Sequence, residues 1–353
     1  MKRYRASVLG GSGFAGAELI RRLLLHPEVE LARVGAADHL GEPLSDALPH
    51  LEGRTNLKFE ALTPERAVAD VDIVLMGLPQ SASIPVVEAA LARGVKVLDL
   101  SGAFRLRKPE QYARYYGETH PRPDLLSGFV YGLPELNRAM IRGAQHVASP
   151  GCFATCIELG LLPLAKAGLL PERIQTVGIT GSSGSGVAPQ LTTHHPTRAN
   201  NLRTYRPLTH QHTPEIEDLL SQAAQHTVQL DFIPVSAPLV RGIFATSFAR
   251  LTGAHTQDSL NAVFRQHYEN EPFVRIPARR APEVVAVAGS NYAEVGFAMG
   301  ASSPDSAATE TVVSVFSCLD NLLKGGAGQA IQNMNLMLGL PETLTLEDVG
   351  PYP

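Results

Sequence analysis

Apolar and polar residues alternate in blocks over the first 150 residues, in the order of strands and helices. Residues 5–38 (RASVLGGSGFAGAELIRRLLLHPEVELARVGAAD) show an apolar strand, a glycine-rich turn, a helix with apolar residues at helical spacing and a second apolar strand. Further strands are predicted at 72–79 and 95–102, separated by a helix that follows a serine-rich cap and ends at Gly94. This alternation predicts an α/β unit with a parallel, doubly wound sheet.

The turn after the first strand carries a glycine pattern that suits a dinucleotide. Gly11, Gly13 and Gly16 satisfy G-x-G-x-x-G, and Gly10 opens the looser G-x-x-G-x-x-G. Such glycines let the backbone turn tightly and approach a pyrophosphate, which then sits on the amide groups at the start of the helix. Because the flanking strands and helix supply the context that the motif requires, the candidate cofactor contacts are Gly10, Gly11, Ser12, Gly13, Phe14, Ala15 and Gly16.

Residues at the ends of the next two predicted strands add to this site. Leu78 and Pro79 follow one strand, and Ser101 follows the other. Open α/β sheets bind ligands at the carboxyl ends of their strands. We therefore expect these three residues to contact the cofactor.

Length and charge limit the classes of protein to which the chain can belong. The chain has 353 residues, 44% of them apolar, and a formal net charge of -4, so roughly two domains with a large core are expected. The sequence has no basic block and no apolar run of about 20 residues, which argues against nucleic acid and membrane as partners. It also opens without a secretory signal, so we expect a cytoplasmic protein that acts on a small molecule.

Two of the three cysteines lie close together in SPGCFATC, residues 149–156. A reducing cytoplasm disfavours a disulfide, a zinc site needs about four ligands and no second pair exists, and a redox pair would be C-x-x-C. We therefore expect no metal, and one nucleophile. Cys152 follows a Pro-Gly turn at the start of a predicted helix, where the thiolate is favoured, whereas Cys156 and Cys318 are expected to pack in the interior.

The segment SPGCFAT resembles the N-P-G-C-[FY]-x-T signature of the N-acetyl-γ-glutamyl-phosphate reductases, relatives of the aspartate-semialdehyde dehydrogenases. Further blocks match in order over nearly the whole chain, among them DLSGAFRL, GITGSSGSGVAP, HQHTPEIE and DNLLKGGAGQAIQNMN. The resemblance implies a Rossmann-type dinucleotide-binding domain, residues 1–149 plus 320–353, and an α+β catalytic and dimerisation domain, residues 150–319. It also implies a homodimer or homotetramer.

The resemblance implies an NADPH-dependent reductive dephosphorylation of N-acetyl-γ-glutamyl phosphate, an acyl phosphate, to N-acetylglutamate semialdehyde in arginine biosynthesis. Cys152 would carry the acyl group as a thioester. One alternative is a related reductase that acts on aminoadipyl phosphate held on a carrier protein, or on an N-succinyl substrate. Another is a regulator that senses a nicotinamide cofactor without chemistry, which would not need Cys152 beside a histidine pair.

The resemblance assigns acid-base work to a histidine of the H-x-H segment, His210 and His212. We favour His210, with His212 as the alternate and Glu215 as the residue that orients the imidazole. Thr213 is predicted to cap the helix that follows.

The resemblance also places several residues beside the cofactor. Ser183 and Gly184 of GITGSSGSGVAP would lie against its nicotinamide half. Asn321, Gly325 and Gly326 would lie beside it on a C-terminal helix that returns to the first domain.

Substrate anions call for arginines, because the guanidinium fork matches carboxylate and phosphate geometry. Arg105 and Arg241 stand where the family motifs carry arginine, and we expect them to pair with the substrate. His194 and Tyr205 of HHPTRANNLRTYRP complete the candidate substrate set. Arg198, Arg203 and Arg206 of the same stretch are further candidates, and for one or two of these arginines we expect an ordinary surface position.

The family resemblance and the residues after the second strand favour different nicotinamide cofactors. Family members place serine and arginine after the second strand, where this chain has Ala36 and Ala37. Asp38 would accept a hydrogen bond from a free ribose hydroxyl and would repel a 2′-phosphate. Alternatively, Asp38 points to solvent, and His39 or Arg54 binds the phosphate. The resemblance favours NADP(H) and Asp38 favours NAD(H); we expect NADP(H), with NAD(H) as the alternative.

Overall fold

The computed structural model describes residues 3–300 and 310–352, which divide into two compact units. Unit 1 comprises Met1–Gly151 with Gly326–Asp348, and unit 2 comprises Cys152–Gly325 with Val349–Pro353. This division differs from the expected one, which gave all of 320–353 to the first domain. Residues 320–325 pack with unit 2, and a Cβ at Gly350 would lie 1.7 Å from the carbonyl oxygen of Ala288 in that unit.

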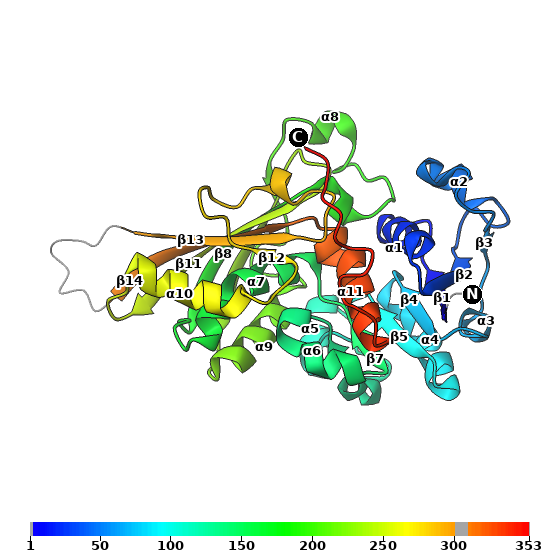
Figure 1. The fold of residues 1–353 in the computed structure, drawn as a ribbon, viewed down its shortest axis with the longest axis horizontal. Coiled ribbons are helices and arrows are strands. Elements are labelled where there is room, and N and C mark those ends of the chain that lie inside the picture. The colour runs from blue at the N-terminus through cyan, green and yellow to red at the C-terminus, as the bar shows by residue number, and fades with distance from the viewer. Residues whose placement is uncertain (1–2, 301–309, 353) are drawn as a thin grey trace. The chain divides into compact units, whose positions relative to one another are not determined.

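Unit 1 is built on a seven-stranded sheet of order β3-β2-β1-β4-β5-β7-β6 (Figure 1). All neighbouring strands in it pair in parallel, which confirms the predicted doubly wound sheet. The strands are β1 Tyr4–Leu9, β2 Val29–Gly35, β3 Phe59–Glu60, β4 Ile73–Met76, β5 Lys96–Asp99, β6 Val130–Tyr131 and β7 His146–Ala148.

The helices between these parallel strands are α1 Phe14–Leu25, α2 Leu44–Ala47, α3 Pro64–Ala67, α4 Gln80–Arg93, α5 Pro109–Tyr116 and α6 Pro134–Gly143. Helix α11, Gly328–Met337, also belongs to unit 1 but comes from its C-terminal segment. Helix α4 ends at Gly94 in the left-handed conformation, as predicted. The predicted serine cap is wrong, because the helix already begins at Gln80 after Pro79 and takes the serines into its first turns.

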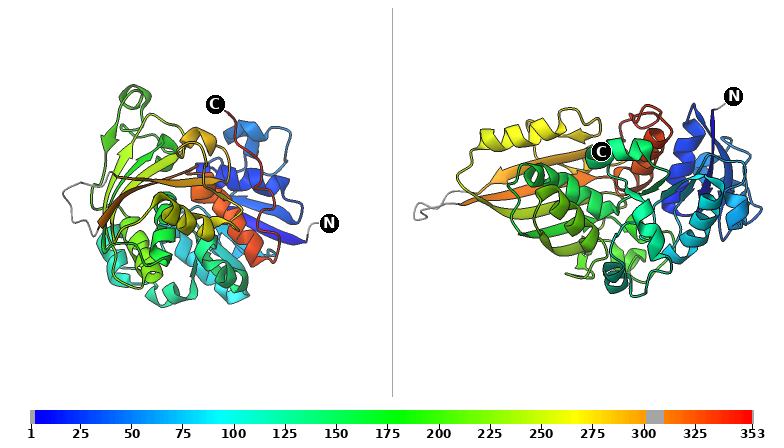
Figure 2. Two further views of the ribbon diagram at one scale, coloured as in Figure 1. Left: turned by 60° about the vertical axis from the view of Figure 1, so that its left-hand side comes forward. Right: turned by 90° about the horizontal axis from the view of Figure 1, so that it is seen from below.

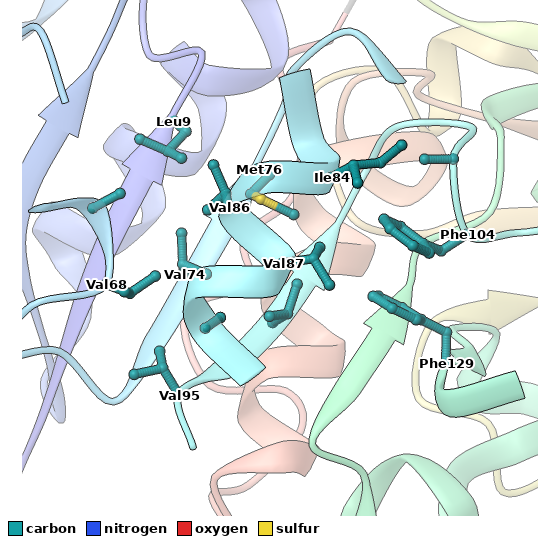
Figure 3. Close-up of a cluster of buried hydrophobic side chains, with 14 of the residues drawn as sticks. Leu9, Val68, Val74, Met76, Ile84, Val86, Val87, Val95, Phe104 and Phe129 are labelled. Atoms are coloured by element: carbon teal, nitrogen blue, oxygen red, sulfur yellow. The ribbon is translucent and has the colours of Figure 1, made fainter. Parts of the chain in front are cut away.

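One apolar cluster holds α4 against the sheet of unit 1. Ile84, Val86 and Val87 of the helix belong to the same buried cluster as Val74 and Met76 of β4 (Figure 3). Beside them the rings of Phe104 and Phe129 stack with centroids 4.1 Å apart. This cluster fixes the carboxyl ends of β4 and β5, after which the predicted ligand residues follow.

Unit 2 contains a second seven-stranded sheet, of order β12-β13-β14-β11-β8-β10-β9. It is mixed, since β8 pairs in parallel with β10 and antiparallel with β11. Its strands are β8 Arg173–Thr180, β9 Arg203–Thr204, β10 Gln229–Ser236, β11 Ile243–Thr252, β12 Val274–Arg275, β13 Ala293–Met299 and β14 Glu310–Leu319. This is the predicted α+β architecture.

Three longer helices of unit 2 lie together over this sheet, namely α7 Cys152–Lys166, α9 Thr213–Ala224 and α10 Gln257–Tyr268 (Figure 2). Helix α7 is the central one and contacts α9, α10, β11 and β14. Its sequence is almost wholly apolar, and every residue from Phe153 to Ala165 is buried. The sheet and its neighbours therefore hold α7 in place. The short helix α8, His195–Arg198, lies apart from this layer in the chain between β8 and β9.

Candidate active site

Cys152 is the first residue of α7, as the sequence predicted. It is half-buried, whereas Cys156 and Cys318 are buried. The Cys156 thiol lies 3.4 Å from the carbonyl oxygen of Ser317, and burial raises the pKa of that thiol to about 12. Burial also raises the pKa of Cys318. Of the three thiols, Cys152 is the one that can reach solvent and a substrate.

Gly325 packs directly against Cys152. A Cβ built on Gly325 would lie 2.9 Å from the Cβ of Cys152, closer than real Cβ contacts come. The turn that brings Gly325 there is held by Asp320, whose carbonyl oxygen accepts the Gly325 N–H at 2.9 Å. In unit 2 this predicted cofactor residue therefore shapes the surroundings of the candidate nucleophile. Gly326, the next residue, belongs to unit 1.

The His210 imidazole is buried among aromatic rings, one of which belongs to Phe153, the residue after Cys152. Its centroid lies 5.5 Å from that of Phe153, 5.3 Å from that of Phe232 and 5.7 Å from that of Tyr205. Burial, with a smaller contribution from the charge of Arg206, lowers the pKa of His210 to about 4. Its Nδ1 accepts the backbone N–H of His212 at 3.2 Å. His210 is therefore neutral near pH 7 and carries its proton on Nε2.

Glu215 faces the other histidine of the pair. Its carboxylate oxygen lies 3.9 Å from Nε2 of His212, and both side chains are buried. That Glu215 orients the favoured histidine, His210, stays a prediction, and the contact described here joins Glu215 to His212. The predicted cap at Thr213 is wrong. Helix α9 begins at Thr213, so the capping position belongs to His212, at the end of the turn from His210.

Tyr205 lies within reach of the charge on Cys152. Burial raises the pKa of Tyr205, the Cys152 charge raises it further, and Arg198 and Arg206 act in the opposite direction. The structure thus brings Tyr205, His210 and Cys152 into one region of unit 2. His194 is exposed just before α8, where its carbonyl oxygen accepts the N–H of Arg198 at 3.0 Å.

The two predicted substrate arginines both have protein partners. Arg241 Nη1 lies 3.4 Å from Oδ2 of the buried Asp320. In unit 1, Arg105 donates from Nε to the carbonyl oxygen of Ser149 at 2.8 Å and from Nη2 to that of Leu100 at 2.6 Å. Arg105 thereby ties the end of β5 to the segment that leads into Cys152.

Two predicted cofactor residues meet although 138 positions separate them. The Asn321 side chain donates from Nδ2 to Ser183 Oγ at 3.0 Å and accepts the Gly242 N–H at 2.8 Å. A Cβ on Gly184 would lie 3.8 Å from the same amide. Asn321 follows β14 in a turn and is not on the predicted C-terminal helix, because α11 begins only at Gly328.

The glycine turn of unit 1 fits a pyrophosphate. Helix α1 begins at Phe14 after Gly13, and its first turn contains no acidic residue. Gly10 has a φ of +77°, and a Cβ on Gly16 would lie 2.2 Å from the Gly10 carbonyl oxygen. Only glycine allows the loop and the helix to approach this closely, which leaves backbone amides at the helix start to face an anion.

The remaining cofactor candidates lie at strand ends of unit 1. Leu78 and Pro79 follow β4, and Pro79 precedes α4. The Ser101 hydroxyl donates to Asp99 at 2.6 Å and accepts the Ala103 N–H at 3.1 Å, so it already holds its own loop.

The chain beyond β2 differs from expectation. Asp38 is exposed and lies three residues beyond the end of β2 at Gly35, not at the strand end. His39, which was considered for the 2′-phosphate, has its Nδ1 2.8 Å from a carboxylate oxygen of Glu42.

Asp320 is the site residue that sequence reasoning missed. It is fully buried at the end of β14, and a lone carboxylate closing an apolar strand in SVFSCLDNLL was a usable signal. Arg206 was a candidate for the substrate, and in the structure its charge lowers the pKa of His210. Among residues 3–300 and 310–352, no cluster of three or more His, Cys, Asp or Glu side chains suits a metal ion. No helix in the same ranges is long and apolar enough to span a membrane.

Comparison with known proteins agrees with this arrangement. Residues 5–144 match the family model for the NAD binding domain of semialdehyde dehydrogenase, and residues 152–321 match that for its dimerisation domain. The N-acetyl-gamma-glutamyl-phosphate reductase of Symbiobacterium thermophilum is 41% identical, over 99% of each chain. The putative [LysW]-L-2-aminoadipate 6-phosphate reductase of Thermomicrobium roseum is also 41% identical, over 98% of each.

Solved structures share the fold. Aspartate semialdehyde dehydrogenase II of Vibrio cholerae matches with a TM-score of 0.71 at 15% identity, over 96% of this chain and 99% of that one. The aspartate semialdehyde dehydrogenase of Candida albicans, solved with NADP, matches with a TM-score of 0.64 at 17% identity. The match covers 95% of this chain and 98% of that one. The family predicted from sequence is confirmed: the chain belongs to the N-acetyl-γ-glutamyl-phosphate reductases, within the semialdehyde dehydrogenases.

Proposed function

We propose that this chain uses NADPH to reduce N-acetyl-γ-glutamyl phosphate to N-acetylglutamate semialdehyde, with release of phosphate. The observation that carries the proposal is the half-buried Cys152 at the start of α7, beside Tyr205 and the His210 and His212 pair. Relatives that are about 40% identical over their full length carry the same activity in their names.

In this proposal the Cys152 thiolate attacks the acyl carbonyl and the carbon–oxygen bond to phosphate breaks, which leaves a thioester. The reduced nicotinamide, when bound, supplies a hydride to the thioester carbon. The carbon–sulfur bond then breaks, releasing the aldehyde and restoring the thiolate. A non-catalytic cofactor sensor would have no use for this arrangement.

We assign different tasks to the two histidines. His212 has the Glu215 carboxylate 3.9 Å from its Nε2, and a histidine beside a carboxylate suits proton transfer, so we assign the uptake and return of a proton to His212. His210 remains neutral and donates a hydrogen bond from Nε2 to the substrate oxygen, where negative charge develops. This reverses the preference drawn from the sequence.

Cofactor binding would use the glycine turn for the pyrophosphate. The backbone near Ser183 and Gly184, held by Asn321, would contact the nicotinamide half. Leu78, Pro79, Ser101 and Gly325 remain proposed neighbours. Arg105 and Arg241 remain proposed substrate contacts.

The second candidate substrate is carrier-bound aminoadipyl phosphate, favoured by the similarity to the Thermomicrobium roseum protein. An N-succinyl analogue is a third.

We also propose a cytoplasmic homodimer or homotetramer formed through the unit 2 sheet. On this sheet Val177, Ile233 and Phe248 are exposed around one cavity of about 430 Å³.

Cys152→Ala is expected to abolish turnover, because no neighbouring group can replace the nucleophile. Purified protein is assayed in reverse with N-acetylglutamate semialdehyde, N-succinylglutamate semialdehyde or carrier-bound aminoadipate semialdehyde, each with phosphate and NADP. The N-acetyl compound is expected to give the highest kcat/KM. Cys156→Ala is the matched control and should keep most of the activity. An active Cys152→Ala enzyme would contradict the proposal.

His212→Gln is expected to lower kcat by roughly 10²–10⁴-fold, the usual range for a lost acid-base catalyst. His210→Gln keeps a hydrogen-bond donor and should lower kcat by roughly tenfold, corresponding to about 1.4 kcal/mol of transition-state stabilisation. Steady-state kinetics of both variants measure the difference. A larger loss for His210→Gln would return the acid-base role to His210.

Burial of neutral His210 makes the stability of the protein pH-dependent. The folded pKa is about 4, below the unfolded value of about 6.5, so the unfolded chain binds more protons between these values. The free energy of unfolding should therefore fall as the pH drops from about 6.5 to about 4. In urea titrations over this pH range, the free energy of unfolding of His210→Gln should fall less than that of the wild type. The exposed control His195→Gln should show the same fall as the wild type.

Asp38→Ser is expected to raise kcat/KM for NADPH relative to NADH by roughly tenfold, because it removes a carboxylate that would repel the 2′-phosphate. The wild-type protein should already prefer NADPH. Asp46→Ser, at another exposed aspartate of unit 1, should leave the ratio unchanged. A wild-type preference for NADH of tenfold or more would show that Asp38 binds the ribose.

A further inference from the structure

Arg198, the last residue of α8, is buried although its sequence neighbourhood is exposed. Its relative exposure is 8%, whereas the residues from His194 to Thr197 and Asn200 to Thr204 are exposed. From the sequence, Arg198 was one of several arginines that could either meet a substrate anion or lie on the surface. The burial of one of them requires a physical reason.

Among residues 3–300 and 310–352, no carboxylate balances the charge of Arg198. Its Nη1 donates to Ser236 Oγ at 2.7 Å and its Nη2 to the Leu239 carbonyl oxygen at 3.5 Å, and its buried Nε has no hydrogen-bond partner. Within the described parts of the chain, no Asp or Glu forms an ion pair with it. Burying a cation without a counter-charge is unfavourable, so folding alone does not account for this side chain.

Arg198 lies beside the proposed active site. The charges of Cys152 and Arg198 both act on the Tyr205 hydroxyl, in opposite directions. The Leu239 carbonyl oxygen that Arg198 contacts also accepts the backbone N–H of Ser182 at 2.8 Å. Ser182 precedes Ser183, the proposed nicotinamide contact. Arg198 is therefore a neighbour of residues assigned to both the nucleophile and the cofactor.

We propose that Arg198 binds an oxyanion of the substrate, either the phosphate or the carboxylate. This assignment rests on the proposed function. A guanidinium group held by two neutral acceptors keeps its full charge for a ligand, and its unused N–H groups suit a phosphate or carboxylate oxygen. The substrate would supply the negative charge that the protein lacks here.

The test compares Arg198→Lys with wild type in the reverse reaction, where aldehyde and inorganic phosphate are varied separately. Lysine keeps the charge and loses the planar fork, so we expect one KM to rise roughly tenfold or more. A higher KM for phosphate identifies the phosphate as the ligand, and a higher KM for the aldehyde identifies the carboxylate. Arg203→Lys, an exposed arginine of the same segment, is the control and should match wild type.

Three results would overturn the assignment: unchanged kinetics, a higher KM for NADP alone, or a lower melting temperature with unchanged kinetics. If wild type turns over no semialdehyde, the proposed function fails, and direct binding decides the role of Arg198. Inorganic phosphate or N-acetylglutamate should then raise the melting temperature of wild type and of Arg203→Lys, but not of Arg198→Lys. Equal shifts in all three proteins would reject an oxyanion site at Arg198.

Discussion

The buried carboxylate of Asp320 organises the region around the nucleophile. One oxygen accepts the N–H groups of Leu322 and Leu323 at 2.8 and 3.1 Å, and the other accepts the Gly289 N–H at 2.7 Å and lies near Arg241. A buried charge is tolerated only when it is satisfied in this way. The same turn sets Asn321 against Ser183 and Gly325 against Cys152, so several candidate site residues depend on one side chain.

The histidine pair shows how the environment separates two identical side chains. His210 is enclosed by Phe153, Phe232 and Tyr205, and accepts a backbone N–H that fixes its tautomer. His212, two residues later, faces a buried carboxylate. Desolvation favours the neutral form of the first imidazole, whereas the second lies 3.9 Å from a carboxylate oxygen. The two histidines look equivalent in the sequence, but the fold gives them different surroundings.

Features fixed by neighbouring residues were predictable. The Pro150 and Gly151 turn followed by an apolar helical pattern placed Cys152 at the start of α7, and the glycine motif placed the turn before α1. Features that depend on distant partners were not predictable. Asp320 meets Arg241 and Gly289, and Arg198 is buried against Ser236 and Leu239, contacts that no local pattern contains. The predicted Thr213 cap was wrong by one residue, because α9 already includes Thr213 and His212 precedes it.

Both sheets end in very short strands. The outer strands β3 and β6 of one sheet and β9 and β12 of the other are each two residues long. Each of β9 and β12 pairs with only two residues of its neighbour, so among the described residues most of β10 and β13 has no strand partner on that side. Protection against pairing with another chain must therefore come from the side chains of these longer strands. Pro234 in β10 has no N–H to donate, and proline is a residue that proteins place at such borders to discourage an added strand.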